Sequence, residues 1–193
     1  MHQSRQLAHF PVSFFTMVMG LSGLCIAWEQ AELVFGLPFH LGNALLTFTI
    51  LVFTLLLALY LGKLWRYPQE VVKELNHPLK LNFFPAISIS LILLATALTG
   101  SLPGVSEVLW SLGTLLHLTF TLYVMNVWIH HDKFEVHHIN PAWFIPVVGN
   151  VLVPIAGTAH GYMEISWFFF SFGILFWLVL FTIIVSRVLF HHP

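Results

Sequence analysis

Six long apolar runs with no Lys, Arg, Asp or Glu in their interiors constrain this chain more than any other feature. An apolar helix of about 20 residues is long enough to cross the hydrocarbon core of a bilayer. Only 8% of the 193 residues are charged, whereas soluble domains carry roughly 25%. The sequence therefore predicts an all-α membrane protein with a single transmembrane domain over residues 1–193. Its predicted spans are residues 11–28, 41–61, 83–102, 108–129, 144–159 and 165–185.

The basic residues predict the orientation of these helices. The loops on one side carry Glu29, Glu32, Glu107 and Glu164 and no basic residue. Cytoplasmic loops of membrane proteins are enriched in Lys and Arg. We therefore expect a multi-pass protein of the cell inner (plasma) membrane with both termini in the cytoplasm. All seven basic residues fall on the predicted cytoplasmic side, opposite these glutamates: Arg5, Lys63, Arg66, Lys73, Lys80, Lys133 and Arg187.

The odd-numbered spans differ in character from the even-numbered ones. They open near Pro11, Pro85 and Pro146 and contain many small or polar residues, whereas the even spans are bulky. This alternation predicts three helix hairpins, each with an inner and an outer helix. Small residues also let membrane helices pack closely, so packing is the alternative to a pore; the repetition favours a pore. The candidate pore-lining residues are Ser13, Thr16, Gly20, Ser88, Thr99, Asn150, Pro154 and Gly157.

These candidates suit the passage of an anion better than its tight binding. Hydroxyl and amide groups can hydrate a passing anion, and the absence of charge in the spans favours easy exit. Pro154 should leave a backbone carbonyl without its helical partner, and that carbonyl should point away or bond elsewhere. His117 is the one histidine well inside a span. We expect it to be hydrogen-bonded near Thr114 or Thr121 rather than to relay protons.

The segment HHDKFEVHH, residues 130–138, places four histidines and two carboxylates in nine residues. If it were helical, His131, Asp132, Glu135 and His138 would converge on a metal ion. The predicted topology instead makes it a short cytoplasmic connection between two spans, and we favour a structural loop. We therefore predict no metal and no cofactor. A haem would need facing histidines inside the spans, and most of the twelve histidines lie at span ends or in loops.

Three segments carry a resemblance to a known family: HFPVSFFTMVMGLSGL, NHPLKLNFFPAISISLILLA and FEVHHINPAWFIPVVGNVLVPIAG. They resemble successive inner helices of the tellurite-resistance/slow-anion-channel family, which comprises TehA-like proteins, voltage-dependent anion channels and malate transporters. The resemblance implies a ten-helix fold in which five hairpins surround a central pore with quasi-fivefold symmetry. It further implies a homo-trimer that passes small inorganic or organic anions. We expect no nucleic-acid partner and no enzymatic activity, because Ser and His occur but nothing resembles a nucleophile elbow.

The chain departs from that family in its number of hairpins. It has three of the five, and the family's gating phenylalanine lies on a ninth helix that these 193 residues do not contain. We therefore expect an incomplete copy of a longer domain, whose arc of three hairpins conducts only when other helices close it. A non-conducting structural or regulatory membrane fragment is the alternative, and a membrane haem protein is a less favoured one.

Overall fold

The computed structural model describes residues 3–38, 40–130 and 141–190. Every regular element in these residues is a helix, and six helical stretches are long and apolar enough to cross a membrane. The predicted fold class, an all-α membrane protein with six spans, is therefore confirmed. The spans are Val12–Phe35, Leu41–Arg66, Lys80–Leu98, Pro103–His130, Pro141–Ala159 and Met163–Phe190.

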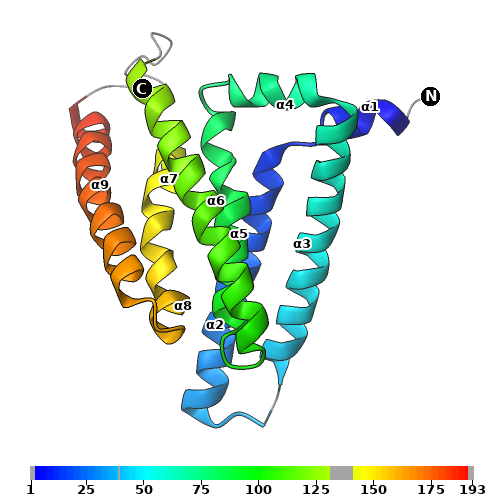
Figure 1. Cartoon of the computed structure of the whole chain (residues 1–193), viewed down its shortest axis with the longest axis vertical. Coiled ribbons are helices and arrows are strands. Elements are labelled where there is room, and N and C mark those ends of the chain that lie inside the picture. Colours follow the sequence, from blue (N-terminus) through cyan, green and yellow to red (C-terminus); the bar gives the residue numbers. More distant parts are fainter. Residues whose placement is uncertain (1–2, 39, 131–140, 191–193) are drawn as a thin grey trace.

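The first hairpin pairs α2 with α3 (Figure 1). After α1 (Gln3–Ala8), its inner segment consists of η1 (Val12–Phe14) and α2 (Phe15–Phe35), and its outer helix is α3 (Leu41–Arg66).

The helix α2 continues well past the predicted end at residue 28. It stops only at Gly36, whose φ of 59° is left-handed and suits glycine. Glu29 and Glu32, expected in a loop, therefore lie on the helix. Glu32 Oε1 accepts a hydrogen bond of 2.9 Å from the backbone N–H of Gly42, which satisfies one of the unpaired donors at the start of α3.

The second hairpin forms the centre of the molecule. The surface helix α4 (Pro68–Leu75) leads to its inner segment, η2 (Lys80–Phe83) and α5 (Pro85–Leu98), and α6 (Pro103–His130) is its outer helix. In this inner segment 78% of the apolar stretch is buried, because α5 packs against α2, α6 and the third hairpin at once. Proline begins α5, where its missing N–H would have no helical partner anyway.

The third hairpin has a broken inner segment. It runs through η4 (Pro141–Trp143), α7 (Phe144–Val148), η5 (Gly149–Leu152) and α8 (Val153–Ala159) before the outer helix α9 (Met163–Phe190). Only 17% of the apolar stretch of α9 is buried, so most of its surface is available to lipid. The three inner segments lie next to one another, with α5 between α2 and α7–α8 (Figure 1).

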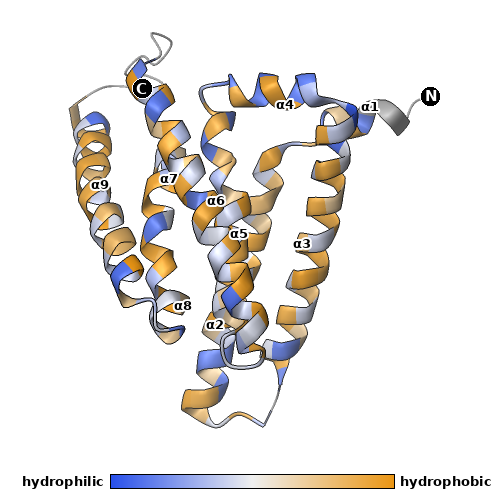
Figure 2. Cartoon of the chain, viewed as in Figure 1, coloured by the Kyte–Doolittle hydropathy of each residue, from blue (hydrophilic) through white to orange (hydrophobic). Residues whose placement is uncertain are grey.

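The two ends of the bundle differ in charge. The N-terminal helix α1, the surface helix α4 and the C-terminal end of α9 lie at one end, and the turns α2–α3 and α8–α9 lie at the other (Figure 1). Figure 2 shows that the middle of the long helices is mostly hydrophobic. Basic residues such as Lys63, Arg66, Lys73 and Lys80 belong to the first end, which we call the basic end.

Candidate functional site

Three of the predicted pore-lining residues lie on the less buried side of the first inner segment. Ser13 and Thr16 are half-buried and Gly20 is exposed. The Thr16 hydroxyl donates a 2.7 Å hydrogen bond to the Ser13 carbonyl oxygen. A Cβ built on Gly20 would meet no other atom within 4 Å. These three residues therefore border space that the described helices leave open.

Ser88, on α5, faces the outer helix α6. Its hydroxyl donates a 2.8 Å hydrogen bond to a carbonyl of its own helix and lies 2.9 Å from Nδ1 of His117, from which it therefore accepts. On the other side of the ring, a Cβ on Gly149 would lie 2.7 Å from Nε2, so only glycine fits there. The prediction that His117 is hydrogen-bonded is confirmed. Its expected position near Thr114 or Thr121 was wrong, because α6 turns the ring toward α5 instead of along its own helix.

Side chains with hydrogen-bond donors support the broken backbone of the third inner segment. Trp110, on α6, donates from Nε1 to the carbonyl of Val153 at 2.8 Å. Thr121, also on α6, donates to the carbonyl of Pro146 at 2.7 Å. The buried Asn150 donates from Nδ2 to the Thr121 hydroxyl at 3.2 Å. This predicted pore residue therefore belongs to a packed contact between the inner segment and α6.

Pro154 breaks the regular helix as expected. It has no N–H for the carbonyl of Asn150, four residues earlier. That carbonyl instead accepts the N–H of Val153 in a 3₁₀ turn, so it is bonded elsewhere. Pro154 itself lines a cavity of about 180 Å³ together with residues of α9.

Thr99 and Gly157 also face the outer helices. The Thr99 hydroxyl lies 3.3 Å from that of Ser106 on α6. A Cβ on Gly157 would lie 2.5 Å from Ser166 Oγ and 2.7 Å from the ring of Trp110. Five of the eight candidates therefore contact outer helices, and pore lining stays a prediction for all eight. The five are Ser88, Thr99, Asn150, Pro154 and Gly157.

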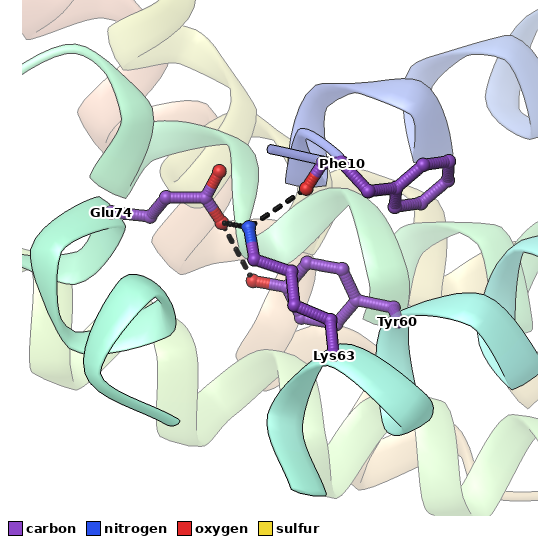
Figure 3. Close-up of polar contacts among 4 residues, drawn as sticks. All are labelled: Phe10, Tyr60, Lys63 and Glu74. Carbon is purple, nitrogen blue, oxygen red and sulfur yellow. Dashed lines mark hydrogen bonds and ion pairs between the residues drawn. The ribbon is translucent and has the colours of Figure 1, made fainter. Parts of the chain in front are cut away.

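A buried charge cluster at the basic end was not predicted (Figure 3). Lys63 Nζ donates a 2.8 Å hydrogen bond to the carbonyl oxygen of Phe10 and lies 2.9 Å from Oε2 of Glu74. The Tyr60 hydroxyl donates to the same Glu74 oxygen at 3.1 Å. The Lys63 and Glu74 side chains are only 1% and 7% exposed. The cluster therefore joins the end of α3, the helix α4 and the start of the first inner segment.

The buried faces of α3 and α4 bring the members of this cluster together. Every third or fourth residue of α3 is buried, and Lys63 continues that face directly after Tyr60. In α4, Val71 and Glu74 are buried and three residues apart, so they share one face of that helix. The sequence marks Lys63 only as an orientation signal, whereas a charge on a buried face requires a partner, which here is Glu74. The rest of the buried face of α3 consists of Gly42, Leu46, Thr49, Phe53 and Leu56.

Most of the histidine-rich segment cannot be compared with this site. His131, Asp132, Glu135 and His138, like Lys133, lie outside the described residues. In the described ranges, no group of three or more His, Cys, Asp or Glu side chains is placed to hold a metal ion. The interpretation of residues 131–138 as a structural loop without metal stays a prediction.

Three adjacent hairpins, with proline-containing inner segments and apolar outer helices, define a multi-pass membrane protein built from repeated helix pairs. The pattern of one family of such proteins, the voltage-dependent anion channels termed SLAC1, matches residues 9–193. The chain belongs to this family. The family resemblance seen in the sequence is therefore confirmed.

Individual relatives carry names that fit this assignment. An uncharacterized transporter of Methanocaldococcus jannaschii, MJ0762, is 26% identical over 97% of this chain and 58% of its own length. The tellurite resistance protein TehA homolog of Haemophilus influenzae is 27% identical over 92% of this chain and 55% of its own length. The S-type anion channel SLAH3 of Arabidopsis thaliana is 26% identical over 94% of this chain and 30% of its own length. The chain thus spans little more than half of these microbial relatives and less of the plant channel.

Proposed function

We propose that the chain forms part of a membrane pathway for small inorganic or organic anions. The observation that carries the proposal is the match of residues 9–193 to the anion-channel family. The arrangement of the helices supports it, because the three inner segments lie side by side and all begin at the basic end. The partial positive charge at the start of a helix favours anions, and here three such starts are close together.

Within this pathway we assign different tasks to the eight candidate residues. Ser13, Thr16 and Gly20 border the open side of the first inner segment, so they are proposed to contact the anion or its water. The other five pack against outer helices and are proposed to shape the pathway from behind. Pro154 cannot donate a hydrogen bond to the carbonyl of Asn150. That carbonyl accepts the N–H of Val153 instead, so it presents no repulsive oxygen to an anion. Hydroxyls without fixed charge suit conduction rather than retention.

We further propose that other helices complete the pathway and that the complete protein is a homo-trimer. The additional helices are supported by the length of the relatives, since the chain matches only 58% and 55% of the two microbial relatives named above. A non-conducting membrane fragment is the competing proposal. An enzymatic role is not proposed: Ser88 and His117 form a serine–histidine contact, but both side chains are fully buried, whereas a nucleophile must reach its substrate.

Anion efflux from liposomes tests the transport proposal. The chain is reconstituted alone and as a fusion to the remaining carboxy-terminal part of the Haemophilus relative. We expect efflux of chloride or nitrate from the fusion and none from the chain alone. Efflux from the chain alone would overturn the need for further helices. If neither protein conducts although both are monodisperse, the transport proposal fails and the non-conducting fragment stands. Native mass spectrometry of the fusion tests the trimer.

A pair of glycine variants of the fusion tests the assignment of the pathway. Gly20→Leu adds a bulky side chain beside Ser13 and Thr16, where a Cβ meets nothing within 4 Å. We expect it to remove most of the efflux without weakening the fold. Gly104→Leu is the matched control, because Gly104 also has open space around it but lies at the start of an outer helix. Equal efflux from the two variants would contradict the assignment.

We propose that the protein lies in the inner (plasma) membrane of the cell. Its basic end and both termini then face the cytoplasm. The exposed residue Arg66 is the last residue of α3, and the exposed Ser101 lies in the turn between α5 and α6. The end of α3 and this turn lie at opposite ends of the bundle (Figure 1). In a background without Cys25, we expect Ser101→Cys to react with a membrane-impermeant maleimide in spheroplasts. Arg66→Cys should react only after permeabilisation. The reverse pattern would overturn the orientation.

A further inference from the structure

We infer that the place now occupied by the Glu74 carboxylate is a binding site for a small carboxylate anion, masked by the protein's own side chain. The carboxylate oxygen Oε2 receives two donors from α3, the Lys63 ammonium at 2.9 Å and the Tyr60 hydroxyl at 3.1 Å (Figure 3). An ammonium and a hydroxyl that converge on one oxygen are what a free carboxylate requires of a protein site.

The partners of Lys63 explain why this place demands an anion. Its ammonium has three N–H donors, and one of them is committed to the carbonyl of Phe10 at 2.8 Å. The ammonium also lies 5.5 Å from the centre of the Tyr60 ring. These neighbours hold the charge in position but do not neutralise it. Because Lys63 is only 1% exposed, water cannot replace Glu74 cheaply, and a negative partner is needed.

The Glu74 carboxylate and the two groups that donate to it belong to different helices. Lys63 and Tyr60 lie on the long helix α3, whereas Glu74 lies on α4, a surface helix of eight residues. The opposite side of α4 is open, since the side chain of Lys73 is 70% exposed and Val72 is 53% exposed. The Lys63 ammonium therefore lies beneath a single surface helix, close to the aqueous basic end.

The variant Glu74→Ala creates the vacancy that tests this inference. It removes Cγ and the carboxylate, which together have the composition of acetate, and it leaves Cβ on the helix. The melting temperature of the purified full chain is measured in detergent against sodium acetate, with the neutral acetamide as the control solute. We expect a saturable rise of the melting temperature with acetate, since a ligand stabilises the state that it binds. Formate should act similarly, and acetamide should have no such effect.

The double variant Lys63→Met/Glu74→Ala is the matched control, because it has the same vacancy without the ammonium. Acetate should not raise its melting temperature beyond the rise seen in the unaltered chain. An equal rise in all three proteins, or none in Glu74→Ala, would overturn the inference.

The yield of monodisperse protein is a second measurement for the case that Glu74→Ala is poorly folded. Acetate during extraction should raise the yield of Glu74→Ala and leave that of the double variant unchanged. A yield that stays low in acetate would also overturn the inference. Anion flux plays no part in either measurement, so failure here would leave the proposed transport function untouched.

Discussion

The first and third inner segments are held in place in different ways. The start of the first is held by a charged donor, from Lys63 to the carbonyl of Phe10, directly before Pro11, and by the buried Ser90 hydroxyl of α5, which donates to the carbonyl of Phe15 at 3.2 Å. The third is held along its length by uncharged donors of α6, Trp110 and Thr121. The difference shows that a proline-interrupted membrane segment can be stabilised by a buried charge at its start or by uncharged donors along its length. Single substitutions should therefore weaken the first support more than the second.

The largest effect is expected from Glu74→Ala, measured without added carboxylates. Removal of one partner from a buried ion pair leaves a buried charge uncompensated, which destabilises by about 3–5 kcal/mol. Reversible unfolding in mixed detergent micelles measures this loss. Glu70→Ala is the control, because Glu70 pairs with the exposed Lys73 at 2.6 Å and surface pairs contribute little. Equal losses in the two variants would contradict the charged support of the first segment.

Gly149→Ala should have the next largest effect, through the close contact between the third segment and α6. The new methyl group would lie 2.6 Å from Cε1 of His117 and from Cδ1 of Ile89. Ile89 can change rotamer, but the His117 ring is held by Ser88 at 2.9 Å. Overpacking of this kind destabilises by about 2 kcal/mol. The same unfolding assay on Gly104→Ala, which has no close neighbour, should show no loss; a loss there as large as in Gly149→Ala would refute the steric explanation.

Trp110→Phe should destabilise the chain by less. It removes the donor to the carbonyl of Val153 and keeps an aromatic ring beside Tyr162, on which Trp110 is stacked. Loss of one such hydrogen bond costs about 1 kcal/mol. Trp167→Phe is the control, since Trp167 is 59% exposed. Unfolding curves that coincide for the two variants would show that this hydrogen bond does not stabilise the third segment.

Thr121→Val should have the smallest effect of the four. It removes the donor to Pro146, and hydrogen bonds between membrane helices contribute about 0.6 kcal/mol on average. Thr119→Val is the control, because its exposed hydroxyl bonds only within its own helix. Trp110 and Thr121 lie three turns apart, so their effects should add in the double variant. A loss in the double variant well above the sum would argue against independent supports.

The spans and their pairing could be predicted from the sequence because length and apolarity alone decide which segments enter a bilayer. The ends of the helices could not. Glu29 and Glu32 are charged, yet residues 29–35 continue α2 to Phe35, since glutamate is a good helix former and the helix extends beyond the hydrocarbon. Only Gly36, with its left-handed backbone, ends it.

The structure of the candidate site could be predicted only where a residue has the same effect on its own backbone whatever its neighbours are. Pro154 lacks an N–H whatever its neighbours are, so the break in the helix followed from the sequence. The partner of His117 depends on which side of α6 meets α5, and it proved to be Ser88. Burial of Lys63 depends on α4 folding back over the end of α3. Such contacts between separate elements are not encoded in the local pattern around either residue.

The position of Lys63 at the end of α3 serves both orientation and packing. In the orientation proposed above, an unpaired lysine after the second span would help to retain its loop in the cytoplasm during insertion. Once α4 has been synthesised, Glu74 neutralises the same ammonium. All the groups of the cluster lie within residues 10–74, before the second hairpin begins. The first hairpin can therefore complete its own charge balance before any later helix is inserted.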